Sequence, residues 1–381
     1  MKEVFYIGEF DFNRKNASAV RIINNCKALL EYGDIGIKII GYSDISHFKE
    51  GDLSVINVPR GKNLLLKLFF YIFRSYFVIH LLEKNIEKPD VLIYYGASAR
   101  ILLPLIIYCK VRRIKIVADI VEWQDYSHLP FGKFGPVALD VYLCLTRLIP
   151  RCDGVIAISS FLFNHFKNRG LPTIRIPVLV DTQHNNRSEP IPDFDKNCLN
   201  LIYAGFPGQK DLLFNAIDAI EQLASEGIMI KLHVLGPTKK QLERLGRNRF
   251  SDAIICYGQM AQDKVAFFLE QADFSVLLRP DKRYAHAGFP TKFVESIKAG
   301  LPVIANYTSD LSLFLKDGYN GFVVDDCSAN ALITKVKYIL STDKGTFCQL
   351  RINARQTAVE HFDYRLFSKE LGDFISHLVV T

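Results

Sequence analysis

The segment Phe274–Ala305 contains residue types that can bind an anionic ligand. An apolar, β-branched run ends just before Arg279, whose guanidinium can bind a phosphate through two hydrogen bonds. After a loop, Pro290 and Thr291 begin a predicted helix that ends at Gly300. Because the free N–H groups of a helix start attract anions, we expect a phosphate to bind there. The alternative for Arg279 is a surface ion pair.

Three more residues of this segment suit a ligand that combines phosphate and sugar. Lys292 places a positive charge in the first turn, which is unfavourable for the helix dipole alone but suits a bound phosphate. The carboxylate of Glu295, one turn later, can accept hydrogen bonds from two adjacent sugar hydroxyls. Gly288 allows the backbone to approach a ligand closely. The alternative for both charged residues is a helix start with solvated charges.

Short apolar runs alternate with stretches of helical periodicity, as in Ala17–Tyr32 and Leu212–Ser225. This rhythm predicts βαβ units and buried parallel strands. The predicted strands are Val4–Ile7, Gly36–Gly41, Val91–Tyr95, Ile114–Ala118, Gly154–Ile158, Leu201–Ala204, Ile230–Leu235, Ile254–Tyr257, Phe274–Leu278, Pro302–Asn306 and Gly321–Val324.

A break in this rhythm over 182–196 contains two prolines and no apolar periodicity, so it predicts a linker. The fold class is therefore α/β, with two Rossmann-like domains, 1–181 and 197–362, facing each other across a cleft. Periodicity does not decide whether the helix predicted over 363–381 joins the first domain or stays with the second. Ligands of open α/β sheets bind at the carboxyl ends of the strands.

The first domain offers a site for an acceptor. Its first loop, 8–18, is rich in polar residues and follows the first predicted strand, so it should border the acceptor. Arg21 follows on the next helix. It either binds a phosphate of the acceptor or is solvated as an ordinary surface arginine.

Composition and charge limit the class of protein. The 381 residues are 49% hydrophobic and 23% charged, as in an ordinary globular protein. The eight cysteines show no metal-ligand spacing and no signal peptide is evident, which predicts a reduced cytoplasmic protein without a metal site. The net charge is +7, and 53–118 alone contains eleven Lys or Arg against three acids. That excess predicts an anionic partner, namely a phospholipid or a phosphate-bearing substrate, rather than nucleic acid, for which no module pattern is present.

The segment 63–82 is both basic and strongly apolar. As a helix its 20 residues would reach ~30 Å, but Lys67, Arg74 and His80 interrupt it. An amphipathic helix is the better prediction, either packed on the sheet or dipping into a membrane surface. We expect peripheral membrane contact through 60–82 that presents a lipid-linked acceptor.

Residues 287–303, AGFPTKFVESIKAGLPV, resemble the donor-binding segment of family 4 glycosyltransferases of the GT-B fold, in the variant found in bacterial surface-polysaccharide members. The resemblance implies that Glu295 holds the nucleotide ribose and that Gly288, Phe289 and Pro290 belong to the donor site. The family's first Glu, which contacts the donor sugar, is replaced here by Ala287. Nearby His286 or Asp281 could take its place.

Other matches extend this resemblance along the chain. Leu201–Gly205 resembles the first strand of the family's second domain, which places Gly205 at the donor site, and Lys210 matches the lysine that grips the donor pyrophosphate. The alternative for Lys210 is an exposed lysine at a helix start. The arginine that accompanies it in the family is absent, so Arg279 can supply that charge. Asp119 and Glu122 follow a strand where family members carry a catalytic acid or histidine, although Asp119 could equally cap the next turn.

The resemblance implies a retaining, metal-independent enzyme. It would move a sugar from a nucleotide-diphosphate donor to a glycan or a lipid-linked glycan in bacterial surface polysaccharide synthesis, without a cofactor. Lys210, Arg279 and the helix-start amides near Thr291 would stabilise the leaving diphosphate.

Two alternatives remain. One is an epimerase or hydrolase of nucleotide sugars with the same fold. The other, favoured by Ala287, is an inactive homologue that acts as a scaffold for another transferase.

Overall fold

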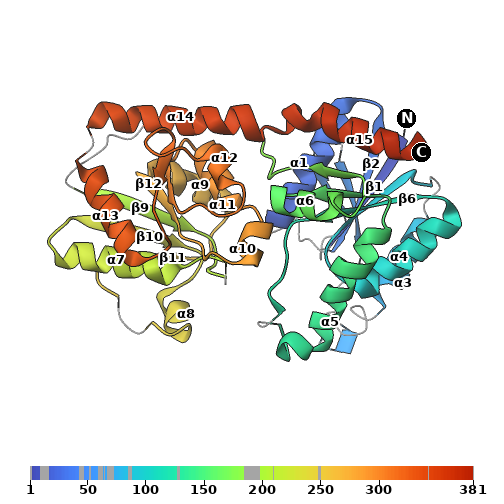
Figure 1. Cartoon of the computed structure of the whole chain (residues 1–381), viewed down its shortest axis with the longest axis horizontal. Coiled ribbons are helices and arrows are strands. Elements are labelled where there is room, and N and C mark those ends of the chain that lie inside the picture. Colours follow the sequence, from blue (N-terminus) through green and yellow to red (C-terminus); the bar gives the residue numbers. More distant parts are fainter. Residues whose placement is uncertain are drawn as a thin grey trace. The chain divides into compact units, whose positions relative to one another are not determined.

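The structure, a computed structural model, describes residues 2–8, 17–42, 47–50, 53–58, 63, 65–66, 73–84, 88–126, 129–183, 198–208, 210–247, 250–341 and 343–380. The chain forms two compact units, one of Met1–Leu179 with Tyr364–Thr381 and one of Val180–Asp363 (Figure 1). Of the predicted linker, only Thr182 and Gln183 are among the described residues.

Eight strands form the sheet of the first unit, in the order β3-β4-β2-β1-β5-β6-β7-β8. All of them run parallel except β3, which is antiparallel to β4. They are β1 (Lys2–Gly8), β2 (Ile35–Tyr42), β3 (His47–Glu50), β4 (Leu53–Val58), β5 (Val91–Tyr95), β6 (Lys115–Ile120), β7 (Gly154–Ala157) and β8 (Thr173–Arg175).

The C-terminal helix completes the first unit. Helix α15 (Ser368–Val380) packs against α1 (Ala17–Tyr32), and Leu371, Ile375 and Leu378 join the core beneath α1 (Figure 1). The other helices of this unit are α3 (Arg74–Lys84), α4 (Ala99–Arg112), α5 (Pro136–Leu143) and α6 (Ser160–Lys167), with short helical turns η3 (Gly132–Phe134), η4 (Cys144–Leu148), η5 (Ile149–Arg151) and η6 (Tyr364–Phe367).

Six parallel strands form the second sheet, in the order β11-β10-β9-β12-β13-β14. They are β9 (Leu199–Ala204), β10 (Ile230–Leu235), β11 (Ile254–Gly258), β12 (Phe274–Leu277), β13 (Val303–Ala305) and β14 (Gly321–Val323). The helices are α7 (Leu213–Ser225), α8 (Lys239–Arg244), α9 (Gln262–Gln271), α10 (Arg283–Ala287), α11 (Thr291–Lys298), α12 (Leu311–Phe314), α13 (Ala329–Leu340) and α14 (Lys344–Phe362).

Some elements differ from the sequence-based expectation. Strand β6 continues to Ile120, two residues beyond the predicted end, because Asp119 and Ile120 keep pairing with β7. A short helix, α10, lies in the predicted loop after Arg279. Of the predicted helix over 63–82, the described part contains helical residues 65–66 and, from Arg74 on, α3. Among the described residues, no helix has both the length and the apolar character needed to cross a bilayer.

Candidate functional site

Three neighbouring strands of the second sheet, β9, β12 and β13, bring polar residues to one edge. Because they are parallel, their carboxyl ends meet there, and each strand continues into a loop that contains a candidate site residue. Gly205 follows β9, Arg279 follows the end of β12, and Asn306 follows β13. The structure therefore brings together residues from distant parts of the sequence at the edge where α/β sheets bind ligands.

Arg279 is held in place from several directions. Its backbone N–H donates to Asn306 Oδ1 at 2.9 Å, and Asn306 Nδ2 donates back to the Arg279 carbonyl at 2.8 Å. The guanidinium donates from Nε to the carbonyl of Lys210 and from Nη1 to Thr308 Oγ1, both at 3.4 Å. The side chain is almost fully buried, and this burial lowers the pKa of its guanidinium. Arg279 is thus a preorganised cation and not the surface ion pair of the alternative prediction.

A carboxylate that the sequence analysis missed, Asp211, neutralises this region. Its Oδ2 forms an ion pair with Lys292 Nζ, and its Oδ1 lies 3.7 Å from Arg279 Nε. The hydroxyl of Tyr203 donates to Asp211 at 3.0 Å and accepts from Lys292 Nζ at 2.9 Å. Burial and the neighbouring Asp211 raise the pKa of Tyr203, so its phenol stays protonated. One carboxylate therefore faces two cations. Its only signal in the sequence is its position next to Lys210.

Glu295 lies on α11, one turn after Lys292, and is half-buried. Burial raises the pKa of its carboxyl, and Lys292 and Lys298 oppose this shift. Within the described part of the chain, its carboxylate has no hydrogen-bond or ion-pair partner. A desolvated acceptor without a donor is costly unless a ligand supplies one, which fits the predicted contact with sugar hydroxyls.

The residues that lead into α11 have different roles from one another. Pro290 is the N-cap and Thr291 the first residue of the helix, as the sequence predicts for an anion-binding start. Phe289 is buried, with its ring against those of Phe293, Phe314 and Phe362, so its side chain belongs to the core rather than to a donor site. This corrects the prediction for Phe289. The backbone of Gly288 has φ −93°, which other residues also adopt.

The position at which the resembling family has its first Glu is buried in this protein. Ala287 is fully buried at the end of α10. The neighbouring His286 accepts a hydrogen bond at Nδ1 from the N–H of Ser309, so its Nε2 carries the proton and donates to Asp281, 2.5 Å away. Both ring nitrogens of His286 are thus used within the protein.

Lys210 lies in the loop between β9 and α7, and its side chain is partly exposed. Its carbonyl accepts from the Arg279 guanidinium, which places the two predicted donor-binding residues in contact.

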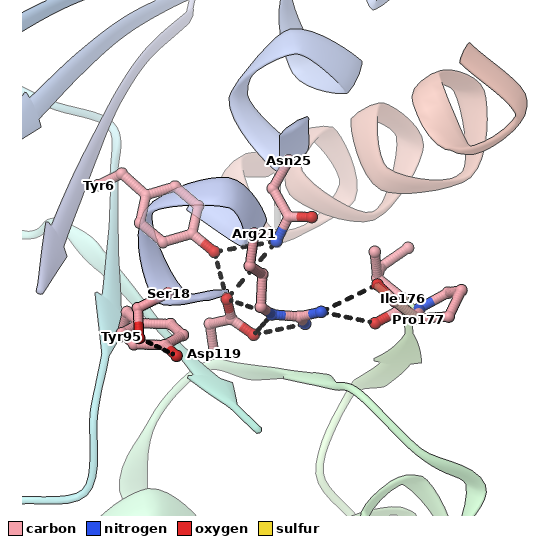
Figure 2. A network of polar contacts seen from close by, with 8 residues as sticks. All are labelled: Tyr6, Ser18, Arg21, Asn25, Tyr95, Asp119, Ile176 and Pro177. Carbon is pink, nitrogen blue, oxygen red and sulfur yellow. Dashed lines mark hydrogen bonds and ion pairs between the residues drawn. The ribbon is translucent and has the colours of Figure 1, made fainter. Parts of the chain in front are cut away.

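In the first unit, Asp119 and Arg21 form the centre of a buried network (Figure 2). Arg21 donates from Nη2 to Asp119 Oδ1 at 2.7 Å, and from Nη1 to the carbonyls of Ile176 and Pro177 at 3.0 and 2.9 Å. The Tyr6 hydroxyl donates to Asp119, and Asn25 Nδ2 donates to the Tyr6 oxygen at 3.1 Å. Burial, and to a lesser extent the neighbouring Asp119 carboxylate, raises the pKa of the Tyr6 hydroxyl, so the phenol keeps its proton.

These contacts correct two predictions. Arg21 is only 2% exposed and Asp119 is fully enclosed in β6, so neither is available to an acceptor or a donor. Their charges compensate each other and tie α1 to β6 and to the segment after β8. We therefore assign both residues a structural role instead of the acceptor-binding and catalytic roles predicted.

Glu122 is the other predicted catalytic residue. It lies two residues beyond β6, it is half-buried, and its Oε1 accepts from Gln124 Nε2 at 3.2 Å. Since Asp119 lies inside the strand, Glu122 is the first acid beyond the carboxyl end of β6.

Comparison with known proteins identifies a family that the second unit resembles. Residues 195–358 match the family described as glycosyl transferases group 1. WcaL of Salmonella typhimurium, whose name provisionally assigns it as a glycosyltransferase of colanic acid biosynthesis, is 25% identical over 239 residues. That match covers 60% of this chain and 58% of WcaL.

Two solved structures share the fold over the whole chain. The sucrose-phosphate synthase of Thermosynechococcus elongatus has a TM-score of 0.76 at 14% identity, covering 100% of both chains. The Anabaena protein HepE, in complex with UDP-glucose, has a TM-score of 0.68 at 14% identity, covering 99% of this chain and 100% of HepE.

Proposed function

Since residues 195–358 match the group 1 glycosyltransferases and the chain has the GT-B fold, we propose that it belongs to this family and transfers a sugar from a nucleotide-diphosphate donor to a glycan. The single observation that carries this proposal is the half-buried Glu295 carboxylate, which lacks a partner among the described residues and lies one turn from Lys292. A diol next to a diphosphate complements such a pair, because the diol donates to the carboxylate and the diphosphate binds the cation.

The second unit supplies the groups that act on the donor. Glu295 accepts hydrogen bonds from the ribose hydroxyls, while Lys292, Arg279 and Lys210 face the diphosphate. The start of α11, at Pro290 and Thr291, adds backbone N–H groups. Negative charge develops on the leaving diphosphate as the bond to the sugar breaks, and preorganised cations stabilise it. Asp211 holds Lys292 and Arg279 in place until the donor arrives.

This set of cations supports a reaction without a metal ion or another cofactor, and the family resemblance supports retention of the anomeric configuration. In the first unit, Glu122 stays the candidate for contact with the reacting sugar. We expect transfer to continue at full rate after chelation with EDTA. By NMR, the product should keep the anomeric configuration of the donor. Loss of turnover that Mg²⁺ restores would contradict the metal-independent reaction.

We further propose that the acceptor is a lipid-linked glycan in bacterial surface polysaccharide synthesis, for which the protein contacts the inner face of the membrane. The similarity to WcaL, named for colanic acid biosynthesis, supports this acceptor class. So does the basic excess over 53–118.

The test is a thermal-shift screen of nucleoside diphosphates and their sugars, followed by transfer assays with the stabilising donor. Glu295→Ala and Lys292→Ala should each abolish most of the shift. Lys264→Ala, on the exposed start of α9, is the matched control and should leave it unchanged. Conversion of the donor without any acceptor would instead indicate an epimerase or hydrolase. Donor binding without turnover on any acceptor would indicate a scaffold.

A further inference from the structure

The outer faces of α4 and α5 in the first unit are apolar where helix surfaces are normally polar. On α4, Leu103, Ile107 and Val111 are exposed at four-residue intervals, so they form one stripe on the side away from the sheet. On α5, Leu139, Tyr142 and Leu143 are exposed at the spacing of a second stripe.

These helices form one continuous layer. Helix α4 packs against both α3 and α5, and α5 contacts η3 (Figure 1). Asp140 of α5 accepts hydrogen bonds from Ser98 Oγ at 2.8 Å and from the Arg100 N–H at 2.9 Å, which fixes α5 to the start of α4. At the other end of α4, Arg112 pairs with Glu83 of α3 at 2.5 Å. The two apolar stripes thus belong to one layer of helices that these contacts hold together.

A short turn next to α5 carries two aromatic side chains into solvent. Phe134, at the end of η3, is 100% exposed, and Phe131, just before it, is 86% exposed. Phe131 has φ +65°, a left-handed conformation that a bulky residue rarely adopts. Strained backbone of this kind is retained mainly where the exposed group has a function. Lys133 lies between the two aromatic residues and is also exposed.

The charge of this surface indicates which kind of partner binds to it. Together α3, α4 with Arg113, and residues 129–151 contain nine Lys or Arg and two acids. The two acids, Glu83 and Asp140, are the residues already paired within the layer. A second copy of the chain, docked through the same face by two-fold symmetry, would bring two strongly positive surfaces together. An anionic lipid surface complements both features, because it accepts aromatic and aliphatic side chains below the headgroups and attracts the basic residues around them.

We propose that this surface, with Phe131 and Phe134 as the inserted tip and Arg113 and Lys133 at the headgroups, binds an anionic lipid bilayer. The attachment surface is thus formed mainly by α4, α5 and η3, rather than by 60–82 alone as the sequence suggested. The inference builds on the proposed lipid-linked acceptor, but its test needs no sugar transfer, so the two can fail separately.

The experiment is flotation of the purified full-length protein with vesicles of phosphatidylcholine alone and of phosphatidylcholine mixed with phosphatidylglycerol. The wild type should float with the anionic vesicles. The double variant Phe131→Ser/Phe134→Ser should bind about a hundredfold more weakly, or more weakly still, because two aromatic rings no longer insert into the bilayer. Arg113→Gln/Lys133→Gln should lose about fivefold for each charge removed.

Matched controls come from α9 of the second unit, where Phe267 and Lys264 are also exposed. Phe267→Ser and Lys264→Gln should bind vesicles as the wild type does. Far-UV circular dichroism and the melting temperature should be unchanged in every variant, since all these side chains lie outside the core. Absence of flotation by the wild type, or equal loss in the α9 controls, would overturn the proposal. A dimer by light scattering that the Phe131→Ser/Phe134→Ser variant dissolves, without flotation, would identify the surface as a protein interface instead.

Discussion

The side chain of Lys292 passes directly over Gly205. A Cβ at Gly205 would lie 2.4 Å from Cε of Lys292, and Gly205 has φ +128°. The backbone conformation therefore favours glycine, and a methyl group there would have to displace the Lys292 side chain. This close approach lets a lysine from the first turn of α11 reach Asp211 in the loop after β9. It joins the two segments that resemble the family's donor site.

The first prediction concerns Gly205→Ala. The new methyl group must displace Lys292, so binding of the stabilising nucleoside diphosphate should weaken by about tenfold or more, the effect of losing one charged contact. The strained backbone should also lower the free energy of unfolding by about 1–3 kcal/mol. Calorimetric titration and urea unfolding measure the two effects. Gly170→Ala is the matched control, because Gly170 also has a positive φ but no atom lies within 4 Å of the place its Cβ would take. It should lose stability and keep its affinity; an equal loss of affinity there would refute the role of Lys292.

The second prediction concerns Asp211→Asn. The substitution removes the negative charge that competes with a diphosphate for Lys292 and Arg279. Without ligand the protein should be less stable, since two cations lose their counter-charge. Affinity for a nucleoside diphosphate should rise by about three- to tenfold at low salt, and the gain should shrink as salt is added. Titration at two ionic strengths measures this. A fall in affinity would show that Asp211 mainly orients Lys292 rather than competing with the ligand.

The third prediction concerns the buried pair of Arg21 and Asp119. Arg21→Met leaves Asp119 as an unpaired buried carboxylate and should cost about 3–5 kcal/mol in urea unfolding. The double variant Arg21→Met/Asp119→Leu should recover part of this loss. Arg247→Met serves as the control, because its ion pairs with Asp218 and Glu221 are partly exposed and should contribute about 1 kcal/mol or less. An Arg21→Met protein with wild-type stability but no transfer activity would restore the predicted acceptor role.

The fourth prediction concerns pH and Glu295. Because burial raises the pKa of this carboxyl in the folded state, the stability contributed by its neutral form is present below pH 4.5 and is lost as the pH rises through the raised value. Glu295→Gln should therefore melt at a higher temperature than the wild type at neutral pH, and the difference should vanish near pH 4. The same variant should lose donor binding. Glu243→Gln, on the exposed face of α8, is the control and should show neither effect. A Glu295→Gln protein that melts lower at neutral pH would contradict the desolvation of this group.

Much of the fold follows from local patterns. The strand Val91–Tyr95 and the helix Ala17–Tyr32 have the predicted bounds, because a buried run or an amphipathic period is a property of consecutive residues. The edge strands β3 and β8 were missed, since strands of only four and three residues at a sheet edge carry little apolar signal, and so was β4 next to β3.

In the candidate site, the sequence by itself located the helix start at Pro290 and Thr291 and placed Lys292 and Glu295 in the turns that follow it, because capping and spacing are local. Only the tertiary structure decided that α15 packs on α1, that Asp119 and Arg21 neutralise each other inside the first unit, and that Asp211 faces two cations. The reason is physical. Whether a charged side chain is a ligand or a structural partner depends on its burial and on the charge beside it, and both are set by residues far away in the chain.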